Sequence, residues 1–281
     1  AQPRWLSPGL HMAQGISGAA IATVISMIVC SVYVLSHFFR KDSIVRFHRS
    51  AFRLSLPVIG GITAIGVAPF AMHLTGSLVN IIMNRSFVSY GETADATDLA
   101  IGAFGIINGY AMLFFMIIIG VAQGMQPIVG FNYGAKNPGR VKSAYRYSCG
   151  VNLLVSFLGF ALAMLMPRTI VSLFTNSEQM IELSASALRT ALIGLSLVGF
   201  QVTTTQFFQS IGFSHKAIFL SLTRQIIFLI PCLLIIPRFM GLDGVWWSLP
   251  ISDLASVVLS FVLITIQMKH FNQSKKTTFA E

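Results

Sequence analysis

The chain has very little charge for its length. Of its 281 residues, only 10% are Asp, Glu, Lys or Arg, and 9 of these are acidic. An ordinary soluble domain carries about 25% charged residues. The low charge therefore excludes a typical soluble domain. The hydrophobic content of 54% and the mean hydropathy of +0.75 instead predict a protein that is embedded in lipid.

Cysteine is scarce as well, and the chain lacks the motifs of metal and catalytic sites. Its 3 cysteines, Cys30, Cys149 and Cys232, lie apart in apolar stretches and form no CxxC pair. This spacing excludes a disulfide framework and a zinc site, and favours small buried side chains. No HExxH sequence and no nucleophile with an adjacent base is visible. We therefore expect no cofactor and no enzymatic activity.

Long apolar runs are abundant, and each is long enough to cross a bilayer. A spanning helix needs about 20 mostly apolar residues. Short alternating segments, which are typical of membrane barrels, are not visible. The sequence predicts an all-α membrane protein with about seven transmembrane helices, at 15–39, 56–88, 99–128, 141–166, 184–211, 217–236 and 244–268.

The basic residues are distributed in a way that indicates topology. If the first helix runs from outside to inside, the inner loops collect most Lys and Arg residues, at 40–53, 136–146, 216 and 269–276. The outer loops collect Glu92, Asp95, Asp98, Glu178 and Asp243. Positive residues face the cytoplasm in membrane proteins. The net charge of +10 therefore indicates contact with anionic lipid headgroups rather than with nucleic acid, and places the C-terminus in the cytoplasm.

The first and last apolar stretches resemble each other, which predicts an internal repeat. "GISGAAIATVIS" begins at Gly15 and "GLDGVWWSLPIS" begins at Gly241, and both stretches end in a basic segment. If these helices are equivalent, the repeat unit contains six helices, as in transporters built from two like halves. We therefore expect three parts: the last helix of a preceding lobe (1–39), a basic cytoplasmic linker (40–55) and a six-helix lobe (56–281).

The stretch "AQGMQPIVGFNYGAKNPGRV" resembles the loop after the eighth helix of the multidrug and toxic compound extrusion (MATE) transporters. "GISGAAIATVIS" is similar to their sixth helix, "LVNIIMNRSFVSYG" to the end of the seventh, "LFTNSEQMIELSASALR" to the start of the tenth and "GVWWSLPISDLASVVLSFVL" to the twelfth. The resemblance implies export of small amphipathic cationic drugs across the bacterial inner membrane in exchange for protons or sodium ions. It also implies that helices one to five, most of the N-terminal lobe, are missing from this truncated form.

Asp253 is the only acidic residue inside a predicted span, near its middle. A charge at the bilayer centre costs about 3 kcal/mol on insertion scales, so such a residue needs a reason. One interpretation is a cation or proton site that faces a central cavity. The other is an ion pair with a structural partner such as Arg224. Serines recur every fourth residue beside it, at 248, 252, 256 and 260, and indicate a close-packed or wet face.

Two further spans carry polar residues on one helical face. The second span has His73, Ser77, Asn80 and Asn84, and the fifth has Gln201, Thr205 and Gln209. Helical spacing puts each set on one side of its helix, and that side is expected to face protein or water rather than lipid. His73 is a candidate for ion coupling because histidine titrates near neutral pH. The other six are candidates for the substrate cavity, with helix-to-helix hydrogen bonds as the alternative.

The inner end of the third span carries Gln123, Gln126 and Pro127, followed by Asn132 and Tyr133 in a segment that we expect to be a loop. Pro127 lacks a backbone N–H and is expected to bend the helix at its exit. These five residues are candidates for a cytoplasmic gate, and a plain stop at the membrane surface is the alternative. The GxxxG pair Gly120 and Gly124 in the same span predicts tight helix packing.

Two other functions remain as alternatives. A seven-helix membrane receptor or sensor has the same helix number and orientation, although the internal repeat argues against it. A lipid-linked sugar flippase of the same superfamily is the second. Such flippases have cavities that are lined by several cations, and the predicted spans contain few of these near their centres.

Overall fold

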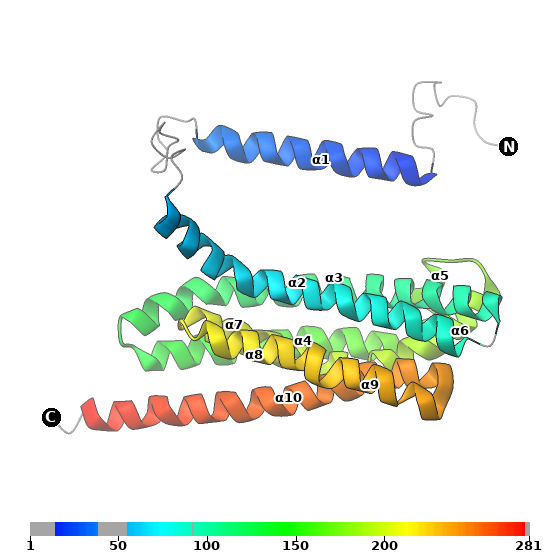
Figure 1. The fold of residues 1–281 in the computed structure, drawn as a ribbon. Helices are drawn as coiled ribbons and strands as arrows, with labels where there is room; N and C mark the ends of the chain where they lie inside the picture. Colours follow the sequence, from blue (N-terminus) through cyan, green and yellow to red (C-terminus); the bar gives the residue numbers. More distant parts are fainter. Residues whose placement is uncertain (1–14, 39–54, 92, 279–281) are drawn as a thin grey trace. The chain divides into compact units, whose positions relative to one another are not determined.

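The computed structural model describes residues 15–38, 55–91 and 93–278 (Figure 1). The chain divides into two compact units, Ala1–Ile65 and Gly66–Glu281. The segment before Gly15 and all but the last residue of the predicted linker at 40–55 fall outside the described residues. The predicted division into a remnant, a linker and a lobe therefore stays a prediction.

Every regular element among the described residues is a helix. The order is α1 (Gly15–Phe38), α2 (Leu56–Tyr90), α3 (Ala94–Gly134), α4 (Pro138–Leu165), α5 (Pro167–Ser172), α6 (Glu178–Ala191), α7 (Leu195–Ser210), α8 (Ser214–Leu222), the π-helix η3 (Thr223–Leu229), α9 (Ile230–Ile235) and α10 (Pro237–Thr278). α1 and the start of α2 belong to the first unit, and the other elements to the second.

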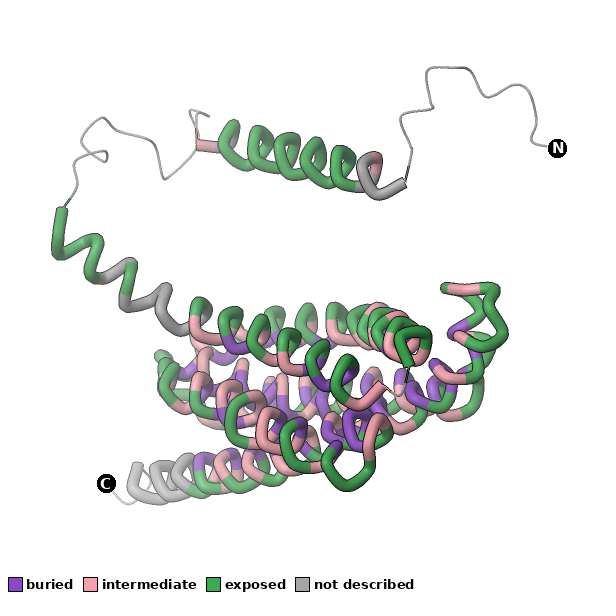
Figure 2. The backbone as a smooth tube through the Cα atoms, turned by 45° about the vertical axis from the view of Figure 1, so that its right-hand side comes forward, coloured by how far each residue is buried: buried purple, intermediate pink, exposed green. Residues whose placement is uncertain are grey.

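The predicted spans fall on these helices, and the all-helical membrane class is confirmed. Among the described residues, four helices are long and apolar enough to cross a membrane, or five if α6 and α7 form one span. The seven expected spans also include α1 and α2, in which the side chains of several residues are not described. Figure 2 shows exposed residues along the outer sides of the helices in 70–269 and buried residues between them. Many exposed side chains are large and apolar, as a lipid-facing surface requires.

Two predicted spans are not regular α-helices. The fifth is broken at residues 192–194, where α6 and α7 meet with a bend of 50°. There, short turns replace the α-helical pattern: Leu195 N donates to Leu192 O at 3.1 Å, and Leu197 N to Gly194 O at 3.1 Å. The sixth contains the seven-residue π-helix η3 between α8 and α9. π-helical segments are rare and occur frequently at functional sites.

The predicted loop at the end of the third span is wrong in its position. α3 continues through Pro127 as far as Gly134, so Asn132 and Tyr133 are helical. The backbone ladder persists, because Phe131 O accepts from Ala135 N at 2.9 Å. The side-chain amide of Asn132 donates to Ile128 O on the same helix at 2.8 Å. The turn to α4 is short and contains Lys136 in the left-handed region, with φ of 53°.

α3, α4 and α7 are joined by a buried polar seam. Asn152 of α4 donates to Ile118 O of α3 at 3.1 Å and to Thr203 Oγ1 of α7 at 2.8 Å. One helical turn further on, Gly199 N of α7 donates to Ser156 Oγ of α4 at 2.8 Å.

The four serines that recur along α10, at 248, 252, 256 and 260, are at most 1% exposed. This face of α10 is therefore close-packed.

The GxxxG prediction fails within the described part of the chain. A Cβ atom added at Gly120 or Gly124 meets no heavy atom within 4 Å, so neither glycine holds a neighbouring helix close. By contrast, Gly130 on the same helix lies against α7, where its Cβ would be 3.3 Å from Ser210 O. The side of α3 that contains Gly120 and Gly124 is therefore open.

Candidate functional site

A polar cavity of about 270 Å³ lies between α2, α3, α7 and the α8–η3 segment. Its apolar wall contains Met72 of α2 with Phe115 and Ile119 of α3. Its polar wall contains Gln201, Thr205, Gln206 and Gln209 of α7 with Ser221, Arg224 and Gln225 of the neighbouring span. Arg224 is the only charged residue among these lining residues. An aromatic and aliphatic wall opposite a polar wall suits an amphipathic molecule.

The four-residue spacing on α7 brings its three predicted residues into this cavity together. Gln201 is only 4% exposed, and Thr205 donates to Gln201 O at 3.0 Å. Within the described part of the chain, the side-chain oxygens of Gln201 and Gln225 are buried without a hydrogen-bond partner. Buried polar atoms normally have partners. Both glutamines line the cavity, so a rotation of either side chain would bring its unpartnered oxygen to a molecule there.

Asp253 of α10 forms an ion pair with Arg224 of η3. Arg224 Nε lies 3.2 Å from Asp253 Oδ1, and the two side chains are 25% and 14% exposed. The Nε–H is not aligned as a hydrogen bond, so the contact is mainly a charge attraction. The geometry matches the alternative in which Arg224 neutralises Asp253. Because Arg224 also lines the cavity, the pair connects a buried carboxylate to the polar wall.

The break between α6 and α7 lies directly against this carboxylate. A Cβ atom added at Gly194 would be 2.5 Å from Asp253 Oδ2 and 2.6 Å from Asp253 Cβ. Only glycine at this position leaves room for the aspartate. The ion pair thus lies where the broken span and the π-helical span meet α10, so that two irregular helices and one charge pair share a single site.

The predicted polar face of α2 does not reach the cavity. His73, Ser77, Asn80 and Asn84 are all exposed, although their neighbour Met72 lines it. The Ser77 hydroxyl donates to His73 O and the side-chain amide of Asn80 donates to Gly76 O, each at 3.1 Å. Both side chains therefore form their hydrogen bonds within α2.

The predicted gate residues lie along the last turns of α3, away from the cavity lining. Gln123 and Pro127 are exposed, and Gln126 is half-buried. Asn132 is half-buried and Tyr133 is 38% exposed. None of these five side chains lines the polar cavity. Their role at a gate stays a prediction.

Sequence reasoning missed half of the polar wall. Ser221 and Gln225 were not singled out, and Arg224 was considered only as a partner for Asp253. A single arginine inside an apolar span is a strong signal, because such a charge is costly in lipid unless it is paired or faces a cavity. That signal was present in "SLTRQIIFL".

An all-helical membrane fold with a polar cavity between spans is typical of the secondary transporters. The profile of the MatE family matches residues 70–235, which is more than half of the chain. The chain belongs to the MATE family of transporters and is not an enzyme. The resemblance that the sequence indicated is confirmed.

Curated relatives are bacterial. The multidrug export protein MepA of Staphylococcus aureus (strain MSSA476) is 25% identical over 255 residues, covering 88% of this chain and 54% of that protein. MepA of Staphylococcus haemolyticus is 23% identical, covering 91% of this chain and 54% of that protein. The chain thus spans about half the length of the curated relatives it matches.

Solved structures share the fold. A MOP-superfamily transporter from Pyrococcus furiosus, described as having a binding pocket of reverse polarity, is 26% identical with a TM-score of 0.78. The match covers 94% of this chain and 58% of that one. An outward-facing MATE transporter of the same superfamily aligns with the same TM-score and coverage at 24% identity. This chain is a multi-pass membrane protein with the MATE fold.

Proposed function

We propose that this chain forms the C-terminal lobe, with one preceding helix, of a multidrug exporter. The complete protein moves small amphipathic cations out of a bacterial cell in exchange for protons or sodium ions, and its C-terminus lies in the cytoplasm. The family match and the multidrug export proteins among the relatives support this proposal. The observation that carries it is the Arg224–Asp253 pair beside the polar cavity.

The cavity has the chemistry that an amphipathic cation needs. Phe115 offers a ring face, which attracts cations, and Met72 offers a polarisable surface that adapts to different shapes. The unpartnered oxygens of Gln201 and Gln225 accept hydrogen bonds from a substrate that carries N–H groups. While Asp253 is ionised, it balances the charge of Arg224, and the cavity wall is neutral overall.

The ion pair explains how a coupling ion can expel a cationic substrate. A proton or sodium ion that binds the Asp253 carboxylate cancels its charge. The guanidinium of Arg224 is then an unbalanced positive charge in the cavity wall. Two unit charges about 8 Å apart repel by about 2 kcal/mol at an effective dielectric constant of 20. This corresponds to a loss of affinity of about 30-fold, so substrate and coupling ion compete without sharing a site.

Binding of ethidium to the purified chain in lipid nanodiscs tests this idea. Ethidium is fluorescent, cationic and carries amino groups that donate hydrogen bonds. We expect its affinity to fall as the pH falls, because protonation of Asp253 leaves Arg224 unpaired. Asp253→Asn is expected to weaken binding about 30-fold at high pH and to remove the pH dependence. The double change Asp253→Asn with Arg224→Gln is expected to restore the affinity, still without pH dependence.

Matched controls separate the cavity from general effects. Asp243→Asn removes an exposed acid from the start of the same helix and is expected to leave binding unchanged. Gln201→Leu is expected to weaken ethidium but not tetraphenylphosphonium, which has no N–H group. Sodium at constant pH reproduces the effect of acid only if sodium is the coupling ion. The proposed coupling is contradicted if the ethidium affinity changes with neither pH nor sodium. It is also contradicted if the double variant binds ethidium as weakly as Asp253→Asn alone.

A further inference from the structure

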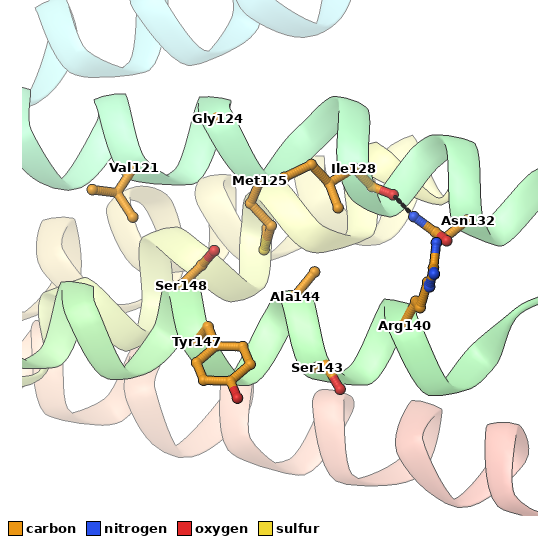
Figure 3. A pocket seen from close by; sticks show the side chains of 10 residues that line it. All are labelled: Val121, Gly124, Met125, Ile128, Asn132, Arg140, Ser143, Ala144, Tyr147 and Ser148. Atoms are coloured by element: carbon orange, nitrogen blue, oxygen red, sulfur yellow. Dashed lines mark hydrogen bonds between the residues drawn. The ribbon is translucent and has the colours of Figure 1, made fainter.

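A second hollow lies between α3 and α4, on the open side of α3 and outside the lining of the polar cavity. It is a groove of about 480 Å³. Figure 3 shows Met125 and Ile128 of α3 pointing towards α4, with Ala144 and Ser148 of α4 pointing back. At one end, Arg140 reaches from α4 towards Asn132 of α3. The groove therefore has an apolar floor and a polar, positively charged end.

The charge around this end is strongly one-sided. Lys136, Arg140, Lys142 and Arg146 lie within the turn and the first turns of α4, and no acidic residue occurs between Leu99 and Ser177. The side chain of Asn137 accepts from Arg140 N at 3.3 Å, which fixes the first turn of α4 and the point from which the guanidinium extends. Arg140 itself is exposed. Within residues 99–177, therefore, no acidic side chain competes with an anionic group at this end of the groove.

The apolar part of the groove is exposed at the surface of residues 66–281. Gly124 lines the groove, and a Cβ atom there would meet nothing within 4 Å. Ile128, next to it along the groove, is 54% exposed. The surface of α3 is therefore open at Gly124, where no side chain blocks an extended hydrocarbon chain. A free anion would use the basic end and leave this surface empty, whereas an amphiphile would cover both.

We propose that this groove binds an anionic phospholipid from the bilayer. The phosphate lies against Arg140, with Ser143 and the amide of Asn132 as further hydrogen-bonding groups, and one acyl chain lies over Gly124 and Ile128. Basic pockets between membrane helices bind anionic headgroups by such charge complementarity. The site is separate from the polar cavity, and its occupation does not depend on what the complete protein transports.

Native mass spectrometry of the 281-residue chain tests the site with phosphatidylglycerol and phosphatidylcholine. We expect the chain to prefer phosphatidylglycerol. Each basic residue near a membrane surface contributes about fivefold to such a preference. Arg140→Gln is expected to lower the preference about fivefold, and Arg140→Lys to keep most of it. Arg189→Gln, which removes an exposed basic residue of α6, is the matched control and is expected to change nothing.

A second variant tests the open surface at Gly124 without a change of charge. Gly124→Leu fills this surface and is expected to lower the occupancy of both lipids while leaving the ratio between them unchanged. Inorganic phosphate at millimolar concentration is expected not to displace the lipid. Equal losses in Arg140→Gln and Arg189→Gln would overturn the proposal in favour of diffuse surface charge. Displacement by inorganic phosphate would identify a free-anion site, and a dimer mass that Gly124→Leu abolishes would identify a second copy of the chain as the occupant.

Discussion

Replacing Gly199 with alanine is expected to destabilise the lobe, whereas the same change at Gly150, a glycine of α4 that faces open space, is not. Gly199 lies where α7 packs against α4, and its N–H donates to Ser156 Oγ at 2.8 Å. A Cβ atom there would lie within 3.0 Å of Asn152 O, Asn152 C and Ser156 Oγ. Two of these three atoms are backbone atoms and cannot move aside without shifting α4.

The expected size of the effect follows from these contacts. Overpacking of a tight interior costs about 1 to 3 kcal/mol. Separation of the two helices also weakens the hydrogen bond to Ser156, at about 1 kcal/mol. Alanine is a better helix former than glycine, which offsets up to about 1 kcal/mol of the lost stability. The sum is a loss of about 1 to 3 kcal/mol, which corresponds to a melting temperature lower by roughly 3 to 10 °C for a unit of this size.

Thermal unfolding in detergent of the purified chain with Cys30→Ser and Cys232→Ser, followed by a thiol-reactive dye at the buried Cys149, measures this loss. Gly150→Ala is the matched control, because Gly150 is an exposed residue of α4 and its Cβ would meet nothing within 4 Å. We expect that variant to be as stable as the original chain or slightly more stable. Equal melting temperatures for Gly199→Ala and Gly150→Ala would refute the close approach of α4 and α7.

Three further changes test the seam and the ion pair. Asn152→Ala removes two buried hydrogen bonds between helices and is expected to cost about 2 to 3 kcal/mol in unfolding measurements, whereas Asn132→Ala, whose amide bonds only to its own helix, is expected to cost less than about 1 kcal/mol. Gly194→Ala pushes the Asp253 carboxylate away from Arg224 and is expected to shift ethidium affinity in the same direction as Asp253→Asn; an unchanged affinity would show that the break tolerates a side chain. Asp253→Asn is expected to abolish ethidium export by the complete protein in a pump-deficient host, whereas export that continues at the rate of Asp243→Asn would remove Asp253 from the mechanism.

The helical membrane fold could be predicted from the sequence because the bilayer imposes one simple requirement. Any segment that crosses lipid must be apolar and must satisfy its own backbone hydrogen bonds. Hydropathy therefore located the four or five spans that the structure describes. The end of α3 was missed for a related reason: Asn132 and Tyr133 look like loop residues, yet the helix extends beyond the apolar core to Gly134. The Asn137–Pro138 pair, which caps and starts α4, was the better marker of the turn.

The irregular helices could not be predicted in this way. A straight span and a broken span have the same hydropathy. Hydropathy therefore does not indicate the bend at Gly194 or the π-helical segment η3. The polar wall was predicted in part, because the four-residue spacing on α7 fixes which residues share a face. Its other half depends on how η3 turns Arg224 and Gln225, and that depends on tertiary packing.

In the π-helical segment, the direction of each side chain depends on the number of residues in the segment more than on how apolar they are. A π-helix accommodates more residues per turn than an α-helix, so the removal of one residue between Thr223 and Leu229 lets the segment become α-helical. The flanking helices α8 and α9 then keep about their present orientation, because the π-helical segment already holds the extra residue, and only side chains within the segment change direction. A single-residue deletion at this point would turn the guanidinium away from its carboxylate while leaving the apolar character of the helix intact, so insertion into the membrane and charge pairing can be separated genetically.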